Sequence, residues 1–466
     1  MSRKTKTLII ALGILILLGG GYYGSTIWKK KKADADLSSR PAALKIGNLD
    51  AAKLVKIEAA GLVLEKKGDA WQLDSLNGTN PPAGLTLDQN SIQNLAASLA
   101  TISIERLVDE TTPADLSVYG LDKPSGRTVI TDSDGKTAVY LVGNMAPSRS
   151  SYYIMQEGDP KVYTVSSYSA ESMQITLDKV RNRTLFASFD TTALTRFRIE
   201  SQDRRIDISA KPESMPPYLS SFINFIMTSP YKLPRGVESQ VLDQVVAPLK
   251  NLAITDFIND SPSSLIPYGL DKPVRVFISA NDASKNSHSM ELLVGNRIDG
   301  KNYAKLADAP GVFTLTGLDA ILNAKAFSLV DKFAMLINID NAEQITVTGG
   351  EKELSAGIKG KGDDAVYSLN GKTIPEKSFK IFYQAIIGMQ LEAEYPGPSA
   401  RKAEDSDRNI TIEFLLNNPA GARVSITLIP YNRDFYSVRQ EGTMEFLISR
   451  DKIRDIYKTA DEVANE

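Results

Sequence analysis

Cysteine is absent from this chain of 466 residues, and histidine occurs once, as His288. Without cysteine there are no disulfides, no thiolate metal ligands, no thiol nucleophile and no lipid-bearing cysteine. A single histidine excludes a histidine-dependent catalytic triad and a multi-histidine metal site. The sequence therefore predicts no catalytic residues from these chemistries.

The chain also has no large excess of positive or negative charge. Lysine and arginine number 54 against 56 acidic residues, which gives a formal net charge of −2. This balance provides no general attraction to nucleic acid, so we expect no nucleic-acid partner. The acidic clusters Asp363-Asp364 and Glu404-Asp405-Ser406-Asp407 lack the alternating oxygen ligands of a calcium loop, and we expect neither metal nor cofactor.

One long apolar run is present near the N-terminus. Residues 7–28 carry no charge and are long enough for a transmembrane helix, which needs about 20 mainly apolar residues. The four lysines at 29–32 separate this run from Ala33-Asp34-Ala35, so a cleaved signal peptide is the less favoured alternative. We expect a single-pass anchor at 7–28 and a linker at 29–43. Basic residues flank both ends, so charge counting does not set the orientation.

The chain repeats itself over the length of a small domain. The hexapeptide Tyr-Gly-Leu-Asp-Lys-Pro occurs at 119–124 and at 268–273, and each copy precedes a Leu-Val-Gly-Asn tetrapeptide, at 141–144 and at 293–296. Gly120 and Gly269 are 149 residues apart, which is the size of a whole domain and not of a solenoid unit. We expect three repeat domains, at 44–188, 189–338 and 339–466, the last being the most diverged.

Each repeat shows the same order of patterns. It opens with an aspartate before an apolar strand (Asp50, Asp190 and Asp340), and it contains an aromatic-x-Leu pair at Trp71, Tyr231 and Tyr367. Helical spacing of apolar residues follows at 88–99, 243–252 and 377–387, and a turn-bounded hairpin closes the repeat. These patterns predict an α+β fold of antiparallel sheets covered by helices. Residues 216–230 in the second repeat are predicted as an apolar insertion that packs between units or faces a partner.

The hexapeptides are the candidate site. Each carries a phenol, a carboxylate and an amine, listed as Tyr119, Asp122, Lys123, Tyr268, Asp271 and Lys272. Glycine permits positive φ, proline restricts the lysine before it, and aspartate bonds to nearby main-chain N–H groups, so a structural turn is favoured over a binding site. No Gly-Lys-Ser/Thr or Gly-x-Gly-x-x-Gly sequence adjoins the tetrapeptides, which argues against phosphate loops there.

These motifs resemble a known family. The apolar anchor, Trp71-x-Leu73, Leu107-Val108, the first hexapeptide, Leu141-Val142-Gly143 and the segment Arg181 to Leu185 are similar to the bacterial domain-of-unknown-function family four-three-four-zero. The resemblance implies a membrane-anchored envelope protein found near components of gliding-type ABC transporters. It implies no catalytic residues.

We therefore expect a non-enzymatic accessory or binding protein, anchored in the bacterial inner membrane with its body in the periplasm or outside. Its expected partners are ABC transporter subunits or another envelope protein. Two alternatives remain: an envelope hydrolase that acts on glycan or peptide through carboxylates in an inter-domain cleft, and a structural spacer.

Overall fold

The structure is a computed structural model that describes residues 44–111, 113, 115–186, 189–215, 222–360, 362–398, 408–418 and 421–465. Within that part of the chain, no helix combines the length and the apolarity needed to cross a membrane. The expected anchor at 7–28 and linker at 29–43 lie outside the described residues. The described chain divides into two compact units, Met1–Asn182 and Arg183–Glu466.

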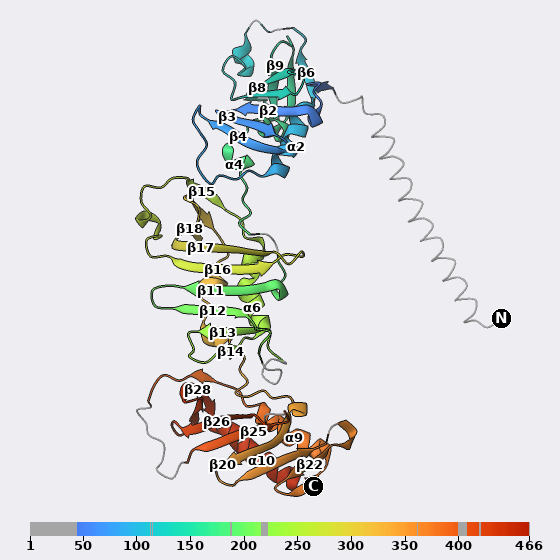
Figure 1. The fold of residues 1–466 in the computed structure, drawn as a ribbon. Helices are drawn as coiled ribbons and strands as arrows, with labels where there is room; N and C mark the ends of the chain where they lie inside the picture. The colour runs from blue at the N-terminus through green and yellow to red at the C-terminus, as the bar shows by residue number, and fades with distance from the viewer. Residues whose placement is uncertain are drawn as a thin grey trace, which may run out of the picture. The chain divides into compact units, whose positions relative to one another are not determined.

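The first unit contains an eight-stranded antiparallel sheet in the order β4-β3-β2-β7-β8-β9-β10-β6 (Figure 1). Its elements are η1 (Ala51–Lys53), β2 (Leu54–Ala59), β3 (Leu62–Lys67), β4 (Ala70–Leu76), α2 (Gln89–Ala100), β6 (Arg106–Asp109), η2 (Leu116–Tyr119), β7 (Gly126–Asp132), β8 (Thr137–Met145), β9 (Ser151–Gln156), β10 (Val162–Ser166), α3 (Ser167–Met173) and α4 (Leu177–Val180), with the short pair β1 (Lys45–Ile46) and β5 (Ile102–Ser103).

The second unit begins with a nine-stranded sheet in the order β14-β13-β12-β11-β16-β17-β18-β19-β15. Its elements are η3 (Thr191–Ala193), β11 (Leu194–Glu200), β12 (Arg205–Ala210), β13 (Phe225–Ser229), β14 (Arg235–Gly236), α6 (Ser239–Val246), η4 (Ala247–Asn251), β15 (Asp256–Asn259), η5 (Ile266–Tyr268), β16 (Val274–Asn281), β17 (Ser287–Ile298), β18 (Lys301–Leu306), β19 (Val312–Leu315), α7 (Asp319–Leu322) and α8 (Ala326–Leu329).

A third sheet completes this unit, with nine strands in the order β23-β22-β21-β20-β25-β26-β27-β28-β24. Its elements are η6 (Ile339–Asn341), β20 (Ala342–Thr348), β21 (Leu354–Lys359), η7 (Gly362–Asp364), β22 (Val366–Leu369), β23 (Lys372–Ile374), α9 (Glu376–Ile387), β24 (Ala393–Glu394), β25 (Ile410–Leu416), β26 (Arg423–Pro430), β27 (Phe435–Gln440), β28 (Thr443–Ser449) and α10 (Arg450–Ala464). Apart from one further edge strand in the second and third sheets, the three sheets share one strand order, so the molecule is built of tandem, mainly antiparallel sheet domains with few helices.

Helices cover one face of each sheet because alternate strand residues are apolar. In the second sheet, Phe197 and Ile199 of β11 share a buried core with Leu242 and Val246 of α6. In the first, Ile57 packs with Ile92 and other residues of α2, which starts at the N-cap Asp88 as the pattern predicted. The opposite face of each sheet is left to polar side chains and to loops that dock on it.

Two details of the predicted repeat pattern are wrong. The third repeat opens on Asn338, which caps η6, and Asp340 lies inside that turn. The predicted insertion at 216–230 contains β13, whose Phe225 and Met227 are buried and take the place of Trp71-x-Leu73. Tyr231 follows that strand and has a different role, described below. Apolar residues on both faces of β13 hid its alternation.

Candidate functional site

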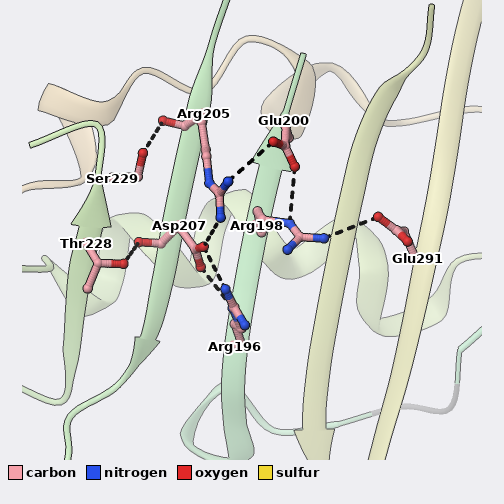
Figure 2. Close-up of polar contacts among 8 residues, drawn as sticks. All are labelled: Arg196, Arg198, Glu200, Arg205, Asp207, Thr228, Ser229 and Glu291. Carbon is pink, nitrogen blue, oxygen red and sulfur yellow. Dashed lines mark hydrogen bonds and ion pairs between the residues drawn. The ribbon is translucent and has the colours of Figure 1, made fainter. Parts of the chain in front are cut away.

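The outer face of the second sheet, opposite α6, carries a network of charged side chains. We call it the charged face, and it consists of Arg196, Arg198, Glu200, Arg205, Asp207, Arg275 and Glu291. Strand alternation places them there: the neighbours Phe197 and Ile199 of β11 enter the core, so the intervening arginines point outward. Figure 2 shows most of these groups converging across β11, β12 and β17.

Asp207 lies at the centre of one half of this network. Arg196 donates to it through Nε and Nη2, at 3.0 and 2.8 Å, and Arg205 donates through Nη2 at 3.1 Å. The carboxylate side chain is 7% exposed, whereas the two arginines are nearly half exposed. Burial raises the pKa of Asp207, but the two guanidinium groups outweigh it and the net pKa is lowered. Asp207 is therefore an ionised anchor that holds two arginines at the surface (Figure 2).

Arg198 organises the other half. Its guanidinium lies over the ring of Phe277, 5.3 Å from the ring centroid, and donates to Glu291 at 3.3 Å. Glu200 lies 3.7 Å from Arg198 Nε and 3.4 Å from Arg205 Nη1, so it links the two halves. Arg275 reaches Glu291 at 3.6 Å. The result is four arginines against three carboxylates on one exposed sheet surface.

The strand registers show that this network is particular to the second repeat. Arg198 is paired with Asp207, and the equivalent pairs are Glu58 with Val63 in the first sheet and Thr346 with Ser355 in the third. The first sheet carries a smaller cluster, in which Lys56 pairs with Glu58 at 2.9 Å, and the same fold thus forms without the arginines. Exposed ion pairs contribute only about 0–1 kcal/mol each to stability, so the fold does not explain why four arginines gather here.

The hexapeptides lie on the outer faces of the first two sheets as turns. Gly120 ends η2 with φ 67° and Gly269 ends η5 with φ 68°. Each tyrosine packs edge-on against another: Tyr119 on Tyr153 at 4.9 Å, and Tyr268 on Tyr303 at 5.2 Å between ring centroids. The turn and the tetrapeptide face each other, since a Cβ on Gly143 would fall 2.2 Å from the Tyr119 carbonyl oxygen.

The charged residues of the hexapeptides point to solvent. Asp122, Lys123, Asp271 and Lys272 are exposed, whereas the leucines beside them, Leu121 and Leu270, are buried in small clusters under the turn. The two copies lie in different units, one in each. The third repeat has no hexapeptide, and its Tyr395 packs on Tyr431 at 5.7 Å instead.

Tyr231 lies where the second and third sheets meet. Its hydroxyl donates to Glu394 at 2.6 Å, and burial, with that carboxylate, raises its pKa. Next to it, Arg235 forms an ion pair with Glu445 at 2.7 Å, both largely buried, and its guanidinium lies 4.9 Å from the centre of the Phe446 ring. These contacts join the two sheets into one unit.

Aspartates line two of the cavities in the second unit. One of about 740 Å³ lies between η3 and α6 and is lined by Asp190 and Asp243. The pKa of Asp190 is lowered mainly by the Thr192 hydroxyl, and that of Asp243 mainly by Lys250, 2.6 Å away. A paired-carboxylate hydrolase needs one carboxyl with a raised pKa as proton donor, and this cavity supplies none.

The other cavity, about 130 Å³, lies where the second and third sheets meet and is lined by Asp331. Burial raises the pKa of Asp331, and the nearby Glu238 adds to this. Glu238 itself caps α6 and does not line the cavity.

His288 is exposed and pairs with Asp282, whose pKa it lowers to about 2 together with main-chain groups. In the described ranges, no cluster of three or more His, Asp or Glu could hold a metal ion.

Sequence reasoning missed the charged face. Its signal was present in Arg196-Phe-Arg-Ile-Glu200 and Arg205-Ile-Asp-Ile208, where charged and apolar residues alternate. That alternation predicts a one-sided strand, but which charges face each other is decided by strand register, which the pattern does not contain.

The comparisons with known proteins give one family. The model described as "Domain of unknown function (DUF4340)" matches residues 71–273 and, in a second match, residues 226–393. No curated protein matches the chain, and no solved structure does.

Proposed function

The chain belongs to the DUF4340 family, and on that premise we propose that it is a non-enzymatic binding protein of the bacterial envelope. In this proposal residues 7–28 anchor the chain in the inner membrane and the sheet domains extend on the outer side. There the charged face of the second repeat binds an acidic surface of an ABC transporter subunit or of another envelope protein.

The observation that carries the proposal is the restriction of the charged face to one repeat. Arginine is the charged residue best suited to interfaces, because its planar guanidinium binds carboxylates in pairs and stacks on rings. Here Asp207 and Phe277 hold the guanidinium groups of Arg196 and Arg198 in place, so less side-chain entropy is lost on binding. The partially exposed arginines then exchange intramolecular carboxylates for those of a partner.

Site-specific crosslinking in membranes tests this proposal. A photo-crosslinking residue is placed at Arg275, and the matched control is at Thr411 on β25, the corresponding strand of the third sheet. We expect a crosslinked envelope protein from position 275 alone, and we expect the triple variant Arg196→Gln, Arg198→Gln, Arg205→Gln to abolish it. Equal crosslinking at both positions, or none at 275, would contradict the proposed surface.

Topology is tested separately. A reporter that is active only outside the cytoplasm, fused after Glu466, should be active in a bacterial host. Activity of a cytoplasmic reporter at the same position, with an inactive external one, would overturn the location.

A further inference from the structure

A cavity of about 530 Å³ lies within the third repeat and is unusually rich in arginine. We call it the arginine cavity. Six of its lining residues are Arg408, Arg433, Arg450, Arg454, Tyr436 and Tyr457. Its volume falls in the range of about 300–1,000 Å³ typical of small-molecule sites.

Local structure brings the arginines together from separate segments. Arg450, Arg454 and Tyr457 occupy positions i, i+4 and i+7 of α10, and residues at this spacing share one face of a helix. Arg408 precedes β25, and Arg433 lies in the loop between β26 and β27.

Tyr457 is the unusual member of the lining. Its side chain is buried, with 5% of the residue exposed, and its hydroxyl donates to no group among the described residues, while a hydrogen bond from the Glu351 main-chain N–H opposes the rise in its pKa. Burial raises the pKa of Tyr457, and the Glu351 carboxylate adds to this, so the hydroxyl keeps its proton. A buried donor without an acceptor costs about 1–3 kcal/mol, which a ligand oxygen at that position would recover.

The main chain of Gly350 packs directly against this hydroxyl. A Cβ on Gly350 would fall 1.8 Å from the Tyr457 oxygen, so glycine at this position makes room for the tyrosine hydroxyl itself. Gly349 has φ 83°, a conformation that side chains rarely adopt. The two glycines therefore keep one wall of the cavity free of side chains.

The charges of the lining favour an anion. Four arginines face one carboxylate of the lining, Glu351, and Arg454 is also paired with Asp451. Arg450 lies over the Tyr436 ring, 4.7 Å from its centroid, which fixes the plane of its guanidinium. Planar guanidinium groups bind phosphate oxygens through two parallel hydrogen bonds.

We propose that the arginine cavity binds a phosphomonoester, with Tyr457 donating to one phosphate oxygen and the arginines neutralising the charge. This site is distinct from the charged face of the second repeat and does not depend on the proposed function. It gives the third repeat a role of its own, as a receptor for a soluble phosphate ester or for a lipid with a terminal phosphate.

Thermal unfolding of the full-length chain in a maltoside detergent tests the proposal. Glycerol 3-phosphate should raise the unfolding temperature of residues 183–466, whereas sodium sulfate at matched ionic strength should raise it less. In the Tyr457→Phe variant, which removes only the hydroxyl, we expect about tenfold weaker binding, as for loss of one hydrogen bond to a charged group. Without ligand, this variant should be as stable as the native chain or more stable.

Charge is tested with matched arginine variants. Arg408→Gln with Arg433→Gln should abolish measurable binding, and the control Arg439→Gln, an exposed arginine of β27 outside the lining, should leave it unchanged. Dihexanoyl phosphatidic acid, used below its micelle concentration, separates the two ligand sources: tighter binding than glycerol 3-phosphate indicates a lipid, and equal binding a soluble ester.

Three outcomes would overturn the proposal. They are equal effects of sulfate and phosphate, full binding by Tyr457→Phe, and binding seen only after Glu404, Asp405 and Asp407 are changed to amides. The last would mean that the acidic run preceding Arg408 in the sequence prevents binding in the native chain.

Discussion

Asp207 illustrates how one buried carboxylate sets the geometry of a surface. Replacing it by asparagine keeps its shape and removes the charge that two arginines share. We expect Asp207→Asn to lower the free energy of unfolding by about 2 kcal/mol at pH 7, the value of hydrogen bonds to a charged group. The partly exposed Glu200→Gln is the control and should lose less. Urea unfolding measures both.

The pH dependence of that loss follows from the lowered pKa of Asp207. A lowered folded-state pKa stabilises the protein above the unfolded-state pKa, about 3.9, and this contribution is lost as pH falls through the folded value. The difference between native chain and variant should therefore shrink below pH 4. A difference that stays constant between pH 7 and pH 3 would show that the charge of Asp207 is not its source.

Asp331 should behave in the opposite way. Burial raises its pKa, so its ionisation destabilises the fold as pH rises through the folded-state value. Asp331→Asn keeps an oxygen that can accept from the Phe333 N–H, 3.1 Å away, and cannot ionise. We expect the variant to unfold at a higher temperature than the native chain at pH 7, with the advantage vanishing below about pH 4, near the unfolded-state pKa. A variant less stable than the native chain at pH 7 would contradict this.

At the scale of elements, the hexapeptide turn packs closely against the tetrapeptide of the same repeat. Gly120 has φ 67°, and a Cβ there would fall 2.4 Å from the Asn144 side chain. Gly158 in the β9–β10 hairpin has φ 86° with nothing within 4 Å, so it isolates the backbone effect. We expect Gly158→Ala to cost about 1–2 kcal/mol and Gly120→Ala to cost more, because it adds a steric clash to the same strain. Equal losses in chemical denaturation would show that the turn does not need its close contact with the tetrapeptide.

Helices and strands whose apolar residues follow one dominant spacing were predictable from the sequence. The helical spacing of apolar residues over 88–99 predicted α2 within a residue at each end. In β13, Phe225, Ile226 and Met227 are all buried, so period-two alternation is lost and the strand was mistaken for an insertion.

Both candidate sites depend on information that local patterns lack. Arg196 of β11 reaches Asp207 of β12 because of the strand register, and the lining of the arginine cavity comes from loops, strands and α10 that are far apart in the sequence. The helix α10 was not predicted, although Ile453, Ile456, Tyr457, Ala460 and Val463 mark one face of it and its remaining residues are polar, which is the pattern of an amphipathic helix.

At the scale of the whole molecule, the buried cores differ in extent. Residues of the first sheet and its helices form one hydrophobic cluster, whereas those of the second and third repeats belong to a single continuous cluster. Arg235 and Glu445 form a largely buried ion pair within the second unit, at 14% and 9% side-chain exposure. We therefore infer that residues 183–466 unfold as one cooperative unit.

Removing one partner of this pair tests that inference by calorimetry of the full-length chain. Arg235→Met leaves Glu445 buried without its cation, which typically costs about 3–5 kcal/mol, so the transition of residues 183–466 should shift down and split into two. The double variant Arg235→Met, Glu445→Leu replaces the whole pair by apolar groups and should recover most of the loss, since buried ion pairs often exchange neutrally for hydrophobic residues. Arg127→Gln is the control, because its pair with Glu157 is half exposed and should contribute less than about 1 kcal/mol. An unshifted single transition in Arg235→Met would mean that the continuous core alone couples the two repeats.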